Sequence, residues 1–159
     1  MNDKFTDEII KNNKVKDYNE VKDTDPYLLE DNCPEFYVGE NIDSYNEYDI
    51  GDIVFVKNYN YNSGKKGYNH LFVIIGKNNY VLPLEFFCML ISSKIDKVKF
   101  KTNILIKKNN KNNLVKDSIV KTDEIYKINK DQIVSYIGKI DNNLIETFKR
   151  MYKDAYEQE

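Results

Sequence analysis

Residues 51–56 read GDIVFV, and residues 70–76 read HLFVIIG. Each is a short run of β-branched and aromatic residues next to glycine, aspartate or asparagine, which is the pattern of a β-strand. The stretch between them, YNYNSGKKGYN at 59–69, contains two glycines and no apolar period. It predicts a loop of about ten residues, and loops of that length in small domains often carry function.

More short strands are expected on the C-terminal side. The apolar runs are YVLPL at 80–84, FFCMLIS at 86–92, TNILIKK at 102–108 and DSIVKTDEIYKI at 117–128, with Lys- and Asn-rich turns between them. Closely spaced strands with a turn signal every ~8–12 residues indicate a small twisted barrel or closed sheet rather than alternating strands and helices. The predicted fold class is therefore mainly β.

A helix is predicted to close the domain. Asp141 or Asn142 can cap its first turn, because a short polar side chain accepts a hydrogen bond there. The apolar residues that follow keep to one face at helical spacing; they are Leu144, Ile145, Phe148, Met151, Tyr152 and Tyr156. We expect this face to pack against the core or against a second copy of the chain.

Charge divides the chain into two parts. Residues 1–50 hold five Lys against 14 Asp and Glu, whereas residues 51–159 hold 19 Lys and Arg against 12 Asp and Glu. This asymmetry indicates a body that binds polyanions, with an acidic N-terminal arm at 1–49 and a barrel domain at 50–159. The arm is expected to fold back on the body through its apolar residues and compete with the polyanion. A simple solvated tail is the alternative.

Composition excludes several classes of protein. A chain of 159 residues with 41% apolar and 13% aromatic residues is expected to form one folded domain. Its longest apolar stretch is too short for a membrane span, and no secretory signal is recognisable, so a cytoplasmic protein is expected. Cys33 and Cys88 are expected to be reduced thiols. With one histidine in the chain a zinc site is not credible, and no metal or cofactor is predicted.

Three segments resemble one family in order and spacing. GDIVFV, then LFVIIG after a Gly-bearing loop, then VLPL are similar to the first three strands of the MazF/PemK toxins. Residues 118–148, SIVKTDEIYKINKDQIVSYIGKIDNNLIETF, resemble the family's C-terminal pattern. The residues that fall in step with that pattern are Ser118, Asp123, Ile125, Ile128, Lys130, Ile133, Ile137, Gly138 and Leu144.

The resemblance covers residues 50–150 and leaves out the acidic arm. It implies an SH3-like barrel with a C-terminal helix, commonly a homodimer, that cuts single-stranded RNA and is restrained by a protein antitoxin. In the family an arginine before the second strand and a Thr or Ser after the third carry cleavage. Here the arginine position falls on Asn69 or His70, and the Thr/Ser position falls on Glu85 or Phe86.

Other residues could supply the chemistry that this arginine and Thr/Ser would provide. Metal-independent RNA cleavage needs a base for the 2′-hydroxyl, an acid for the leaving 5′ oxygen and positive charge near the phosphate. His70 and Glu85 are the candidate catalytic residues, with the carboxylate expected to orient the imidazole ring. A structural histidine at the head of a strand and a surface carboxylate are the alternatives.

The candidate RNA-binding residues form two groups. Lys65 and Lys66 of the loop would hold phosphate beside Asn69, while Tyr59, Tyr61 and Tyr68 would stack on unpaired bases. Lys97, Lys99 and Lys101 would project from one face if 97–101 is a strand. The tyrosines could instead pack in the core, and the alternate lysines could protect an edge strand from aggregation.

We interpret the chain as a toxin-like, metal-independent endoribonuclease acting on single-stranded RNA. The alternative from another class is a non-catalytic module on the same barrel that binds RNA or a protein. A gyrase-poisoning toxin of the same fold is a third, weaker possibility, because the chain contains no tryptophan and that family carries one in its terminal helix.

Overall fold

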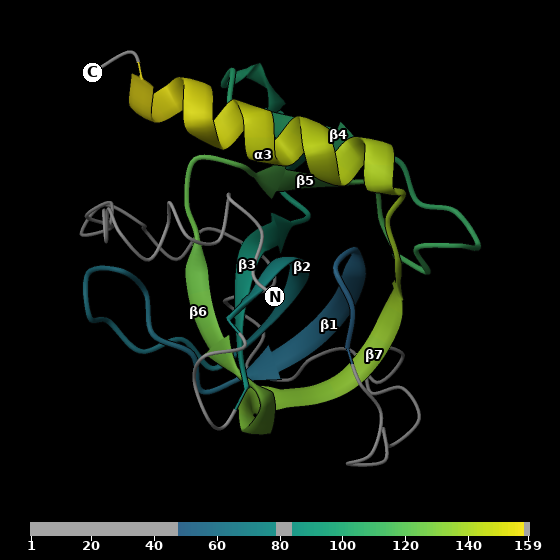
Figure 1. The fold of residues 1–159 in the computed structure, drawn as a ribbon. Helices are drawn as coiled ribbons and strands as arrows, with labels where there is room; N and C mark the ends of the chain where they lie inside the picture. Colours follow the sequence, from purple (N-terminus) through teal and green to yellow (C-terminus); the bar gives the residue numbers. More distant parts are fainter. Residues whose placement is uncertain (1–47, 79–83, 158–159) are drawn as a thin grey trace.

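The computed structural model describes residues 48–78 and 84–157. Its strands are β1 (Asp52–Lys57), β2 (Asn69–Asn78), β3 (Glu85–Ser92), β4 (Asn103–Ile106), β5 (Ser118–Lys121), β6 (Tyr126–Asn129) and β7 (Ile133–Lys139). The 3-10 helices η2 (Ile95–Lys99) and η3 (Lys130–Gln132) and the helix α3 (Asn142–Glu157) complete the described elements. The fold is mainly β with a C-terminal helix, as predicted (Figure 1).

The strands form one antiparallel seven-stranded sheet in the order β4-β5-β3-β2-β1-β7, with β6 paired to β3 outside this path. Strand β3 changes partner along its length. Its first residues pair with β6, where Glu85 faces Asn129, and its last pair with β5, where Ile91 faces Val120. The sheet therefore curves strongly, with β6 and β7 at opposite sides of the view and α3 across the top (Figure 1).

Both faces of the three central strands are buried. In β1, Ile53 and Phe55 belong to one apolar cluster and Val54 and Val56 to another. The first cluster also contains Phe148 of α3, and the second contains tyrosines from outside the sheet. Because successive strand residues point to opposite faces, burial of both faces explains why these strands read as continuous apolar runs.

Helix α3 covers the first cluster with the face that the sequence predicts. Ile145, Phe148 and Tyr152 are buried in it, and Leu144 and Tyr156 pack against it. The backbone carbonyl of Asp141 accepts the N–H of Leu144 at 3.0 Å, so the helix begins where expected. The described residues contain no helix that is long and apolar enough to span a membrane.

Several expected elements differ in the structure. The run 117–128 is two strands, β5 and β6, because a turn at Thr122–Asp123 separates them. Strand β7 is not predicted by the apolar pattern. The expected strand 80–84 lies outside the described residues except for Leu84, which is not in a strand. The arm at 1–49 lies outside them up to residue 47, so the domain division stays a prediction.

Phe148 tests how far α3 stabilises the sheet. Its side chain is fully buried, so Phe148→Ala is expected to lower the free energy of unfolding by about 3–5 kcal/mol through reduced burial and a cavity. Urea unfolding followed by circular dichroism measures the change. The control Arg150→Ala lies on the exposed side of the same helix and should change stability by about 0.5 kcal/mol or less. Equal losses of stability in both variants would contradict the assigned packing.

Candidate functional site

The loop after β1 is an ordered hairpin. Residues 58–68, called the 58–68 hairpin from here on, are joined by backbone hydrogen bonds across the two arms. The donor and acceptor pairs are Asn58 N–H to Tyr68 O at 2.7 Å, Gly67 N–H to Tyr59 O at 2.8 Å and Tyr61 N–H to Lys65 O at 2.8 Å. The hairpin continues the β1–β2 pair, so its tip is held in a defined position.

Tyr59 lies at the centre of an aromatic cluster beneath this hairpin. The centroid of its ring is 5.3 Å from that of Tyr61, 5.1 Å from Phe72, 6.0 Å from His70 and 6.3 Å from Tyr126. Its hydroxyl donates to the Tyr61 hydroxyl at 3.2 Å. Tyr59 and Tyr61 are 0% and 4% exposed, so the expectation that both stack on RNA bases is wrong. They pack in the core instead.

Gly67 clamps the hairpin onto that cluster. A Cβ atom at this position would lie 2.2 Å from Cζ of Tyr59, far inside van der Waals contact. Only glycine therefore lets the backbone of the returning arm lie flat on the Tyr59 ring. The positions of Lys65 and Lys66, immediately before Gly67, and of Tyr68 after it depend on this contact.

The outer side of the hairpin carries the exposed groups. Lys65 and Lys66 are exposed, Tyr68 is 61% exposed, and Asn69 is half-buried at the first position of β2. Two cations and one exposed aromatic ring thus lie within four residues of a rigid turn. This combination can bind a phosphate and stack on an unpaired base.

His70 and Glu85 do not share a site. In the β2–β3 pair Leu71 faces Ile91, while Asn78 faces Glu85. The two residues therefore lie at opposite ends of the pair, roughly 25 Å apart at about 3.3 Å per residue, and the expectation that they are neighbours is wrong. Glu85 accepts a hydrogen bond from the Asn78 amide at 3.1 Å, a contact within the sheet.

The surroundings of His70 are aromatic. The side chain is 1% exposed, its ring contacts Tyr59 and Phe72 edge to face, and its Nδ1 lies 3.1 Å from the carbonyl oxygen of Leu71. Tyr59 and Phe72 pack against the imidazole in this conformation. A base role for His70 therefore requires that its ring becomes accessible to RNA.

The sequence comparison identifies the family. Residues 49–153 match the family described as PemK-like, MazF-like toxin of type II toxin-antitoxin system. The chain belongs to this toxin family. Membership implies an antitoxin as partner. Comparison with curated proteins gives no match.

The strand that runs beside β2 ends in two serines. The strand that pairs with β2 is β3, and it ends at Ser92. Glu85 and Phe86 therefore lie at the start of the third described strand, and Ser92 and Ser93 lie at its end. Ser92 is buried and accepts the Lys94 N–H at 3.1 Å, and Ser93 is half-buried. In the sequence, these two serines directly follow the apolar run 86–91, which is the signal that could have marked this strand end.

Antiparallel pairing brings these serines to the functional end of the sheet. Leu71 faces Ile91, so Asn69 and His70 at the start of β2 lie beside Ser92 and Ser93 at the end of β3. The 58–68 hairpin leads directly into the same strand end. The start of β2, the end of β3 and the 58–68 hairpin therefore lie together at one end of the sheet.

The second basic group is arranged differently from the prediction. Residues 95–99 form the 3-10 helix η2, so the premise that Lys97, Lys99 and Lys101 alternate along a strand is wrong. In a 3-10 helix residues three apart share a face, so alternate positions do not project from the same side. Ile95 and Val98 share a face instead. The sequence analysis took these residues as part of a strand and did not recognise this three-residue spacing.

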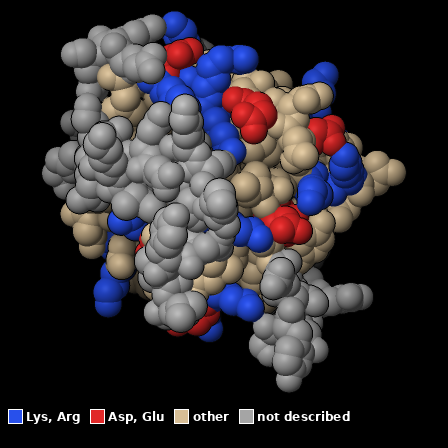
Figure 2. Space-filling view, viewed as in Figure 1, with Lys and Arg blue, Asp and Glu red and all other residues tan. Residues whose placement is uncertain are grey.

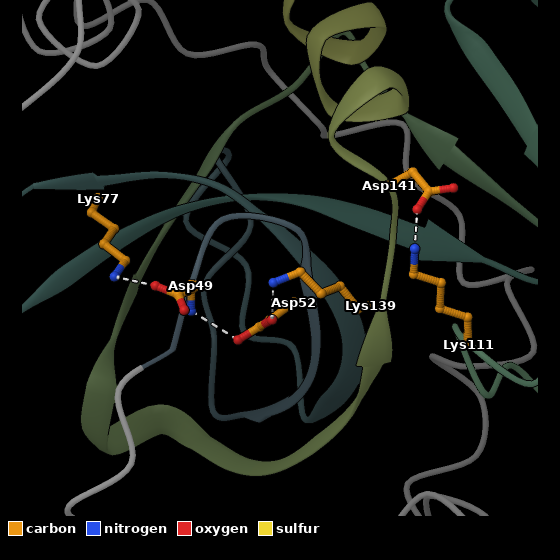
Figure 3. Close-up of polar contacts among 6 residues, drawn as sticks. All are labelled: Asp49, Asp52, Lys77, Lys111, Lys139 and Asp141. Carbon is orange, nitrogen blue, oxygen red and sulfur yellow. Dashed lines mark hydrogen bonds and ion pairs between the residues drawn. The ribbon is translucent and has the colours of Figure 1, made fainter.

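A groove at the opposite end of the sheet is occupied by ion pairs. It has a volume of about 590 Å³ and is lined by residues that include Lys77, Lys139 and Lys149. Lys77 pairs with Asp49 at 3.1 Å, and Lys139 lies 3.7 Å from Asp52, which accepts the Asp49 N–H (Figure 3). Burial raises the pKa of the Asp52 carboxyl, and Asp49 N–H and Lys139 oppose that rise. These ion pairs connect the start of β1 to the ends of β2 and β7.

Surface charge by itself does not identify a site. On the face drawn in Figure 2, the described Lys and Arg side chains form several separate groups, and Asp or Glu lies next to most of them. Within 48–78 and 84–157, no group of three or more His, Cys, Asp and Glu side chains is placed to hold a metal ion. The ordered hairpin and the adjoining strand ends are therefore the best-defined candidate site.

Replacing Gly67 tests the clamp. Gly67→Ala should lower the free energy of unfolding by about 1–3 kcal/mol, because the added methyl group overpacks against Tyr59. Hydrogen exchange should also show faster exchange of the Asn58 and Tyr61 amides, which donate across the hairpin. The control Gly64→Asn lies at the tip with nothing within 4 Å, and Asn tolerates its left-handed backbone, so a smaller loss of stability is expected. Unchanged exchange in Gly67→Ala would contradict the clamp.

Proposed function

We propose that this toxin is an endoribonuclease that cuts single-stranded RNA in the cytoplasm without a metal ion. The observation that carries the proposal is the pairing of Leu71 with Ile91, which directs Asn69 and His70 toward Ser92 and Ser93 beside an ordered basic hairpin, in a chain of this toxin family. Lys65 and Lys66 would hold the phosphate, and Tyr68 would stack on a base. A protein antitoxin would restrain the activity, and the active form would be a homodimer.

The proposed reaction is a transesterification within the RNA. The 2′ oxygen attacks phosphorus, the bond from phosphorus to the 5′ oxygen breaks, and a 2′,3′-cyclic phosphate forms. The 2′-hydroxyl proton passes to the His70 imidazole once its ring is accessible to the RNA, and the leaving oxygen takes a proton from water. Lys65 and Lys66 offset the charge that develops on the phosphoryl oxygens. Glu85 takes no part, because it lies at the other end of the strand pair.

A non-catalytic RNA-binding module is the second candidate function. The burial of His70 beneath Tyr59 favours it, because a base that RNA cannot reach gives no rate enhancement. The exposed lysines and Tyr68 would still bind single-stranded RNA. The two candidates share a binding surface and differ in whether a strand is cut.

Cleavage decides between them. Purified protein in EDTA should cut single-stranded RNA and leave 2′,3′-cyclic or 3′-phosphate ends, which mass spectrometry of the fragments detects. His70→Ala should lower the rate by ~10²-fold or more if the imidazole is the base, while unfolding midpoints report whether the fold survives. Full activity in that variant would remove His70 from the mechanism. No cleavage across a wide panel of RNAs would favour the binding module.

The hairpin lysines should govern binding electrostatics. Replacing Lys65 and Lys66 with Gln should weaken binding to a single-stranded oligonucleotide and flatten its salt dependence by about 0.7 for each phosphate that is no longer neutralised. Fluorescence anisotropy at several salt concentrations gives the slope. The matched control is Lys107→Gln with Lys108→Gln, two exposed lysines after β4. An unchanged slope in the hairpin variant would mean that these lysines only solvate the loop.

A further inference from the structure

The described surface has one concentrated apolar patch. Six large apolar side chains are at least 40% exposed, and four of them lie between residues 95 and 105: Ile95, Val98, Phe100 and Leu105. Ile95 and Val98 share a side of η2, and η2 packs beside β4. Phe100 O accepts the Asn103 N–H at 2.9 Å, which ties the end of η2 to β4. We call this surface the η2–β4 face.

The face is strongly basic and ends at a strand edge. Residues 94–108 contain six Lys and one Asp, so the segment that carries the apolar side chains has a net positive charge. Strand β4 is at the end of the sheet order, and within the described residues only β5 pairs with it. An open strand edge lets an extended polypeptide add backbone hydrogen bonds, with alternate side chains in contact with the face.

These features fit a polypeptide better than RNA. Three of the four exposed side chains on the face, Ile95, Val98 and Leu105, are aliphatic and give no flat ring for a base to stack on, which leaves Phe100 as the single exposed ring among them. A nucleic acid backbone also cannot continue the backbone hydrogen bonding of a β-sheet at an open strand edge. The expected occupant is therefore an extended segment that is acidic and carries large apolar side chains.

The chain itself contains a segment of this chemistry. Residues 25–47, DPYLLEDNCPEFYVGENIDSYNE, hold seven Asp and Glu and no Lys or Arg. The same stretch carries Tyr27, Leu28, Leu29, Phe36, Tyr37 and Val38. Its charge is opposite in sign to that of residues 94–108. Its large apolar side chains could cover the exposed apolar side chains of that segment. The 58–68 hairpin, by contrast, exposes a single large apolar side chain, Tyr68.

We propose that the η2–β4 face is the docking site for the acidic segment 25–47 of the same chain. The segment covers Ile95, Val98, Phe100 and Leu105 with its apolar residues and neutralises the surrounding lysines with its carboxylates. This location is the second basic group of the sequence analysis, at 97–101, rather than the 58–68 hairpin. The proposal does not depend on RNA cleavage.

Disulfide trapping in the full chain tests the proposal, because the segment carries its own thiol at Cys33. The other cysteine, Cys88, is buried, and burial raises the pKa of its thiol, so it reacts slowly. Val98→Cys, Phe100→Cys and Leu105→Cys place a second thiol on the face. Mild oxidation, non-reducing electrophoresis and peptide mass spectrometry then measure how fast each position joins to Cys33.

The controls are Tyr68→Cys on the hairpin and Tyr136→Cys on β7, both at exposed positions. A tether alone brings Cys33 to any surface at an effective concentration of order millimolar, so docking must exceed that baseline. At least one face position should join to Cys33 about tenfold faster than either control. Adding Lys97→Glu and Lys101→Glu to that variant should remove the excess, as should salt at about 1 M.

Four outcomes would overturn the proposal. Equal rates at face and control positions would mean that the segment does not dock there, and fastest trapping at Tyr68→Cys would place it on the hairpin. Trapping only between two molecules would assign the face to a second copy. Loss of RNA binding in Lys97→Gln with Lys101→Gln, without any excess trapping on the face, would assign the face to RNA.

Discussion

The antiparallel register between β2 and β3 is the constraint on which the rest of this structure depends. Leu71 faces Ile91 and Asn78 faces Glu85, and a slip of one residue would turn every side chain of one strand to the opposite face. Since both faces are buried in separate apolar clusters, a slip would also misplace two sets of packed side chains. The same register decides that His70 lies near Ser92 and far from Glu85.

The tyrosines of the hairpin show how packing sets the limits of the site. Tyr59 and Tyr61 fill the space between the hairpin and Phe72, so they serve the second apolar cluster and do not face a ligand. Burial and the nearby Glu124 raise the pKa of Tyr126, which keeps that phenol neutral in the same cluster. The polar groups available for contact at this end of the sheet are therefore those of the hairpin tip and the strand ends.

Charged side chains are arranged differently at the two ends of the described sheet. At one end of the sheet, Lys77 and Lys139 are paired with Asp49 and Asp52 and join the start of β1 to β2 and β7. At the other end, Lys65 and Lys66 are exposed on the hairpin. Paired and partly buried cations are held by their carboxylates, so a count of lysines in the sequence overstates the charge that a polyanion can reach.

The sequence by itself determined the mainly β class, β1, β2, β3 and β4, and the apolar face of α3, because burial imposes local periods of two and 3.6 residues that the chain displays directly. It also carried the toxin family in the spacing of GDIVFV and the C-terminal segment. Only the tertiary structure decided that residues 95–99 are helical, that 117–128 splits into two strands, and that Ser92 rather than Glu85 lies beside His70. These features depend on pairings between residues far apart in the chain, and no local pattern records which strand end meets which.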